Sequence, residues 1–191
     1  MQTYPWSTLE PDSARLNVRT LIDDVRYARS RGLTVFLGIQ SIDTVKREVP
    51  ADLASVAWDD PRMARRFERL LDALSPILAE VTYLSVGNEV AEYLGRSAEW
   101  PAYTRFVSQA VTATHQRAAA VKVGAALEYV GAASQTTFSR ALIAASDVAM
   151  FTLYPFDLGG FTMAPPTIAG SLFDKITSLA GTKPLVMQEL D

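Results

Sequence analysis

The chain has 191 residues, of which 49% are hydrophobic and 20% charged, and its 18 basic and 21 acidic residues leave a net charge of −3. This composition is typical of a single globular domain and lacks the basic excess of a general nucleic-acid binder. The chain contains no cysteine and one histidine, which excludes disulfides, thiolate metal sites, cysteine nucleophiles and multi-histidine metal sites.

No stretch approaches the roughly 20 apolar residues of a membrane span. The first residues lack the basic start and the apolar run of a signal peptide. We therefore expect neither a nucleic acid nor a membrane as a partner, and the sequence leaves the compartment open.

Short apolar runs alternate along the chain with longer amphipathic segments. Residues 4–11 are predicted to be the loop that follows a strand lying before residue 1. In chain order, the next predicted elements are helix 20–31, strand 33–39, helix 61–79, strand 81–86, helix 101–120, strand 121–127, helix 134–145, strand 148–153, helix 171–180 and strand 184–187. A surface loop is predicted over 159–166. Right-handed crossovers turn such a chain into an open doubly wound sheet or a closed barrel.

Two features of the predicted helices are expected to carry no chemistry. Arg62, Arg65, Arg66 and Arg69 alternate with acidic residues at helical spacing, which predicts a solvated helix face. The single histidine, His115, falls inside a predicted outer helix, away from the strand ends.

Polar residues follow the predicted strands where each strand ends, and catalytic groups of α/β barrels lie at the carboxyl ends of their strands. Glu89 and Glu189 each follow an apolar strand with no basic residue nearby in sequence. A half-desolvated carboxylate costs free energy unless a cation or a hydrogen-bond donor compensates it, so such a group is often retained for a function. Two carboxylates on one barrel rim can flank a glycosidic bond, although each glutamate could instead be a solvated residue at a strand end.

Three stretches resemble motifs of the large clan of retaining glycoside hydrolases built on (β/α)8 barrels. Residues 83–89, YLSVGNE, resemble its fourth-strand motif; residues 152–155, TLYP, its sixth strand; and residues 184–189, PLVMQE, its seventh-strand motif. The VGNE and YP forms are most similar to the arabinogalactan endo-galactanase-like branch. The clan's fourth-strand motif usually continues with proline, where this chain has Val90.

The resemblance implies roles for individual residues. Glu89 would be the general acid/base and Glu189 the nucleophile, Asn88 would bind the sugar hydroxyl beside the reacting carbon, and Tyr154 would contact the nucleophile. No metal or organic cofactor is implied, and the partner is a carbohydrate. Other residues expected at strand ends or in the following loops near the sugar cleft are Trp6, Gln40, Glu128, Tyr129 and either Tyr93 or Trp100.

The fold class expected from the resemblance is α/β, an incomplete TIM-type (β/α)8 barrel in one domain over residues 1–191. It would contain about strands two to seven, with strand two ending near Trp6. The missing neighbours would expose two parallel edges. The chain would then be a fragment of a longer product, or a homodimer or the chain's own termini would cover those edges.

Two other functions remain open. A carbohydrate-binding or inactive truncated barrel would keep these residues without holding them rigidly enough for hydrolysis. A different barrel enzyme, such as an aldolase or isomerase, would need a metal cluster or a lysine at a strand end. The lysines, Lys46, Lys122, Lys175 and Lys183, do not fall at carboxyl ends of predicted strands.

Overall fold

The computed structural model describes residues 1–154 and 165–190. Pro155 of the sixth-strand motif and most of the predicted loop over 159–166 lie outside the described residues.

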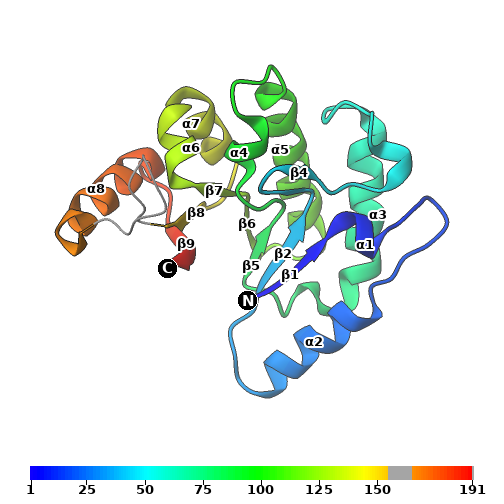
Figure 1. The fold of residues 1–191 in the computed structure, drawn as a ribbon. Helices are drawn as coiled ribbons and strands as arrows, with labels where there is room; N and C mark the ends of the chain where they lie inside the picture. Colours follow the sequence, from blue (N-terminus) through cyan, green and yellow to red (C-terminus); the bar gives the residue numbers. More distant parts are fainter. Residues whose placement is uncertain (155–164, 191) are drawn as a thin grey trace.

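Parallel strands that follow one another along the chain also lie side by side (Figure 1). One sheet has the order β1 (Gln2–Pro5), β2 (Phe36–Gln40), β5 (Tyr83–Ser85) and β6 (Lys122–Gly124), and another has the order β7 (Ala126–Glu128), β8 (Ala149–Leu153) and β9 (Leu185–Leu190). Only Ala125 separates β6 from β7. This order is that of successive strands in a parallel α/β fold, as the alternating pattern predicts.

One expectation for the amino terminus is wrong. The strand that precedes Trp6 lies within the chain as β1, where Thr3 pairs with Gly38 and Tyr4 with Ile39, and not before residue 1. The four residues of β1 contain no apolar run, so hydrophobic patterning does not reveal them.

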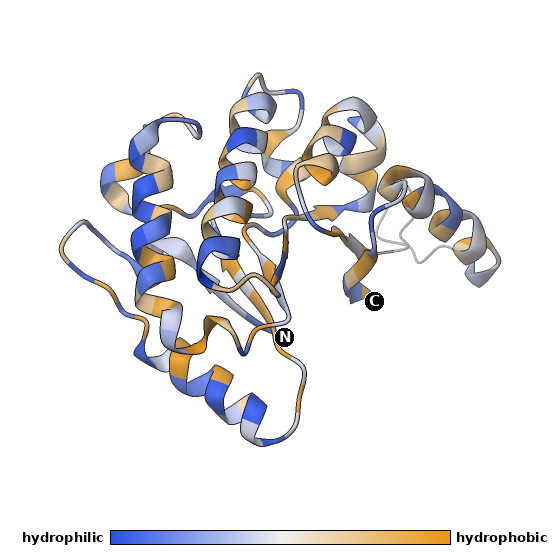
Figure 2. Ribbon diagram, turned by 180° about the vertical axis from the view of Figure 1, so that it is seen from behind, coloured by the Kyte–Doolittle hydropathy of each residue, from blue (hydrophilic) through white to orange (hydrophobic). Residues whose placement is uncertain are grey.

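Amphipathic helices connect the parallel strands. Their bounds are α2 (Arg19–Ser30), α3 (Pro61–Leu78), α5 (Trp100–Arg117), α7 (Thr136–Ala144) and α8 (Ala169–Ala180). The start of α3 follows directly from the sequence, because the Asp60 side chain accepts a hydrogen bond from the Arg62 backbone N–H and proline takes the first helical position. Figure 2 shows hydrophobic and hydrophilic residues alternating around these helices, which fits elements packed on one side.

Several short elements escape prediction, because they are too short to show a period. They are the helices α1 (Trp6–Leu9), α4 (Val90–Leu94) and α6 (Tyr129–Ser134), the antiparallel hairpin of β3 (Ile42–Asp43) and β4 (Lys46–Arg47), and the 3-10 helices Ala51–Leu53 and Pro166–Ile168.

An aromatic cluster forms the centre of the core between α1, α3 and α5. The Trp6 ring packs edge-on to Phe67 with centroids 5.3 Å apart and stacks on Phe106 at 6.0 Å. Trp6 is 0% exposed. A side chain with no exposed face cannot stack on a sugar ring, so the prediction that Trp6 lines the cleft is wrong. Trp100 is equally buried and stacks on Phe138, which also removes it from the cleft.

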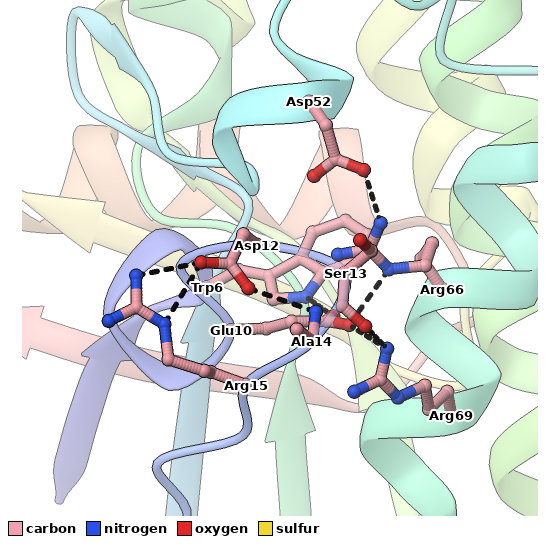
Figure 3. A network of polar contacts seen from close by, with 9 residues as sticks. All are labelled: Trp6, Glu10, Asp12, Ser13, Ala14, Arg15, Asp52, Arg66 and Arg69. Carbon is pink, nitrogen blue, oxygen red and sulfur yellow. Dashed lines mark hydrogen bonds and ion pairs between the residues drawn. The ribbon is translucent and has the colours of Figure 1, made fainter.

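A buried ion network ties α3 to the segment after α1 (Figure 3). Glu10 is 0% exposed and receives hydrogen bonds from the Trp6 indole at 3.0 Å and from the Arg66 Nε at 2.8 Å. Arg69 lies 3.4 Å from the same carboxylate, and Arg66 also reaches Asp52 at 2.5 Å. The prediction that Arg66 is solvated is therefore wrong: its side chain is 14% exposed because a buried carboxylate requires a cationic partner.

In the parallel sheets of the described residues, β1, β6, β7 and β9 each pair with one strand, and only Ala125 separates β6 from β7. β1 pairs with β2 alone, and β9 pairs with β8 alone. Leu185 and Leu190, the first and last residues of β9, are exposed large hydrophobic residues. Among the described residues, no helix is long and apolar enough to cross a membrane.

Candidate active site

The end of β5 turns sharply into α4 and places Asn88 and Glu89 at the carboxyl end of the strand. The turn depends on Gly87, where a Cβ atom would lie 2.3 Å from the Tyr103 hydroxyl and 2.6 Å from Val90. Glu89 has a left-handed backbone with φ of 48°. Non-glycine residues in this region cost free energy and concentrate at functional sites.

Both oxygens of the Glu89 carboxyl group are held by threonine hydroxyls. Thr44 donates to Oε2 at 2.7 Å, and Thr152 donates to Oε1 at 2.9 Å. Glu89 is 9% exposed. Because one donor comes from the hairpin after β2 and the other from β8, the carboxyl group is fixed from two sides of the site.

Asn88 lies in a chain of amide and carboxylate hydrogen bonds across the strand ends. Its Nδ2 donates to Asp43 Oδ1 at 3.1 Å, and Gln40 Nε2 donates to the same oxygen at 3.1 Å. Gln188 Nε2 donates to Asn88 Oδ1 at 2.6 Å. The side chains at the ends of β2, β5 and β9 therefore belong to one network.

A bulge in β9 brings two consecutive polar residues to the site. Phe151 of β8 pairs with Met187, whereas the next residue, Thr152, pairs with Glu189, so Gln188 is the extra residue. The Tyr154 hydroxyl donates to Glu189 Oε2, and Gln188 Nε2 approaches Glu189 Oε1 at 3.5 Å.

Thr152 and Gln188 connect the two glutamates. Thr152 bonds the Glu89 carboxyl group and is the strand partner of Glu189, and Gln188 bonds both Asn88 and Glu189. Glu89 and Glu189 therefore share one rim of the parallel strands, a hundred residues apart in sequence. Among the described residues, neither glutamate takes part in an ion pair.

Glu128, at the end of β7, is a third carboxyl group at this rim and pairs in register with Thr152. Both of its oxygens are buried and have no hydrogen-bond partner. Burial, with smaller contributions from the nearby Glu92 and Glu89 carboxylates, raises the pKa of Glu128 to about 8. Gly131 leaves the space for this carboxyl group, because a Cβ atom there would lie 1.6 Å from Oε1. Glu128 therefore holds its proton at neutral pH.

The structure places the remaining candidates as follows. Gln40 is 9% exposed and belongs to the network around Asn88. Tyr129 and Tyr93 are partly buried against the core. His115 lies in α5 and contacts Asp147 at 2.8 Å, on a different element from the glutamates. In residues 1–154 and 165–190, no group of three or more histidine, aspartate and glutamate side chains is arranged to hold a metal ion.

Sequence reasoning missed four residues of the site: Asp43, Thr44, Thr152 and Gln188. Gln188 and Thr152 could have been found as polar neighbours of strand-end residues already singled out. No signal in the sequence marks Thr44, because its position depends on an unpredicted hairpin.

No protein-family model matches the sequence, and no curated protein sequence matches it significantly. Solved structures do match. A fungal β-1,4-galactanase superposes with a TM-score of 0.69 at 16% identity, covering 100% of this chain and 60% of the galactanase. An exo-β-1,4-mannosidase from Opitutaceae bacterium strain TAV5 gives 0.70 at 12% identity, with 99% and 38% covered. A β-galactosidase from the psychrophilic Marinomonas ef1 gives 0.72 at 13% identity, with 99% and 43% covered.

The chain thus has the fold of TIM-barrel glycoside hydrolases and spans between 38% and 60% of the length of these three proteins. At sequence identities of 12% to 16%, this similarity establishes the fold alone. The residues of the site must support the chemistry independently.

Proposed function

We propose that this chain carries the active site of a retaining glycoside hydrolase that cleaves β-glycosidic bonds in an oligosaccharide or polysaccharide. The single observation that carries the proposal is the connection of Glu89 and Glu189 through Thr152 and Gln188 at one rim of parallel strands. Two carboxyl groups across a sugar-sized site are the machinery of glycoside hydrolysis.

In the first step, Glu189 attacks the anomeric carbon while Glu89 transfers its proton to the leaving oxygen, so the glycosidic C–O bond breaks as the glycosyl–enzyme ester forms. In the second step, Glu89 takes a proton from water, and the hydroxide oxygen displaces Glu189 from the anomeric carbon. This double displacement retains the configuration and needs carboxyl groups about 5–5.5 Å apart, against about 6.5–9.5 Å for inversion.

The surrounding contacts suit these roles. The hydrogen bond from Tyr154 orients the Glu189 carboxyl group for attack. Asn88 is held by Gln188 and Asp43, and we assign it to the hydroxyl beside the reacting carbon. Gln40 would contribute at the sugar cleft through the network around Asn88, whereas both carboxyl oxygens of Glu128 are buried, so the prediction that Glu128 binds the sugar is wrong. No metal or organic cofactor enters these steps.

We also propose that the described strands correspond to about strands two to seven of the eight-stranded barrel. The single partners of β1 and β9 support this correspondence. They also favour a second candidate function, a carbohydrate-binding barrel without hydrolysis, because a site supported by fewer neighbours loses rigidity. A homodimer that covers the two edges would restore that support.

Hydrolysis is tested by incubating the chain with a panel of aryl β-glycosides and β-linked polysaccharides, followed by NMR of the product anomer. We expect hydrolysis with retention, and loss of at least about 10³-fold in Glu189→Gln because the nucleophile is removed. Glu68→Gln is the control, since Glu68 is exposed on α3. Full activity of Glu189→Gln would refute the assignment, and sugar binding without turnover by the unmodified chain would favour the second function.

A further inference from the structure

The hairpin β3–β4 contains a strained residue that faces the proposed acid/base. Thr44 has φ of 50°, and together with Glu89 it makes up the positive-φ non-glycine residues found in the described part of the chain. For a β-branched residue such as threonine, a left-handed backbone is an outlier that persists only when the surroundings enforce it.

The two strained residues are bonded to each other. The Thr44 backbone N–H donates to the Asn88 carbonyl at 3.1 Å, and the Asn88 N–H donates to the Ile42 carbonyl at 2.9 Å. The Thr44 hydroxyl then reaches Glu89 Oε2 at 2.7 Å. The hairpin therefore follows the backbone of the Asn88–Glu89 turn and adds one side-chain contact at the carboxyl group.

The hairpin is itself anchored away from the site. The Arg47 guanidinium lies 3.9 Å from the centre of the Trp58 ring and 3.8 Å from the Glu99 carboxylate, and the Trp58 indole donates to Glu99 at 2.7 Å. The Arg47 side chain is 14% exposed. Because its base is fixed in this way, the hairpin can hold Thr44 at a defined place over Glu89.

Resting on the proposed function, we propose that Thr44 is a positioning residue that aims the Glu89 carboxyl group. With Thr152 bonded to Oε1 and Thr44 bonded to Oε2, rotation of the carboxyl plane breaks at least one hydrogen bond. In the proposed mechanism, Glu89 donates a proton to the leaving oxygen and later accepts a proton from water. Both transfers require the carboxyl group to keep one orientation. Losing the Thr44 hydroxyl would leave the carboxyl group held on one side only.

The test compares Thr44→Val, which removes the hydroxyl and keeps the branched shape, with Thr44→Ser, which keeps the hydroxyl. The substrates are the 2,4-dinitrophenyl and phenyl β-glycosides of the sugar that the unmodified chain cleaves best. A dinitrophenolate leaves without a proton, whereas a phenolate needs one, so kcat/KM for the two substrates separates proton delivery from other damage.

We expect Thr44→Val to lower kcat/KM about 10- to 100-fold for the phenyl glycoside and less than about 3-fold for the dinitrophenyl glycoside. Thr44→Ser should restore the phenyl rate to within about 3-fold.

Equal losses on both substrates, or no loss on the phenyl glycoside, would overturn the role of Thr44. Thr44→Ala serves if Thr44→Val does not fold, because alanine has no β-branch to resist the left-handed backbone. The proposed function fails separately if Glu89→Gln cleaves the phenyl glycoside as fast as the unmodified chain. The positioning role falls with it in that case, whatever the Thr44 variants do.

Discussion

The buried carboxyl group of Glu128 predicts how stability depends on pH. Its pKa is raised from the ordinary 4.5 to about 8 in the folded chain, first by burial and then by Glu92 and Glu89. Between these values, the folded chain holds a proton that the unfolded chain has released. The contribution of Glu128 to the free energy of unfolding therefore falls as the pH rises, by about 1.4 kcal/mol per pH unit and by about 5 kcal/mol in total up to pH 8.

Glu128→Gln removes this titration and keeps the shape of the protonated side chain. The difference in unfolding free energy between the variant and the unmodified chain should therefore shift in favour of the variant by about 1.4 kcal/mol for each pH unit from 4.5 to 8. A constant offset from burying the amide would not change that slope. Urea denaturation at pH 5, 6, 7 and 8 measures the difference.

Glu68→Gln is the matched control for the denaturation series, because Glu68 is an exposed glutamate. Its difference from the unmodified chain should stay flat across the same pH range. A flat difference for Glu128→Gln as well would show that Glu128 ionises as in water, and would refute the reasoning from its burial.

Two further predictions concern packing and charge. Gly87→Ala should lower the free energy of unfolding by about 1–3 kcal/mol, because the new Cβ atom would lie 2.3 Å from the Tyr103 hydroxyl. Thermal unfolding measures this loss, and an unchanged melting temperature would contradict the close approach. Arg66→Ala should cost about 3–5 kcal/mol in urea denaturation because Glu10 loses its principal counter-ion inside the core. Arg65→Ala, at an exposed position of the same helix, should stay within about 0.5 kcal/mol, and equal effects of the two arginine variants would contradict the buried ion pair.

Much of the architecture could be predicted from the sequence because long elements have a period. The apolar runs mark β2, β5, β8 and β9, and the amphipathic segments mark the helices between them within a few residues. The shortest elements could not be predicted, because β1, the hairpin and the short helices contain too few residues to show a hydrophobic period.

The site could also be predicted only in part. Asn88, Glu89, Tyr154 and Glu189 could be singled out because they end apolar strands, and the backbone brings those ends to one rim. Trp6 also ends a strand, yet its side chain turns into the core between two phenylalanines. Strand position alone does not say which way the residue after a strand points.

The bulge in β9 separates the two ends of that strand. Before it, side chains keep the alternation with β8 that packs the interior, and after it the pairing is offset by one residue. Consecutive side chains of a regular strand alternate between its two faces, so the offset is what allows both Gln188 and Glu189 to reach the same rim.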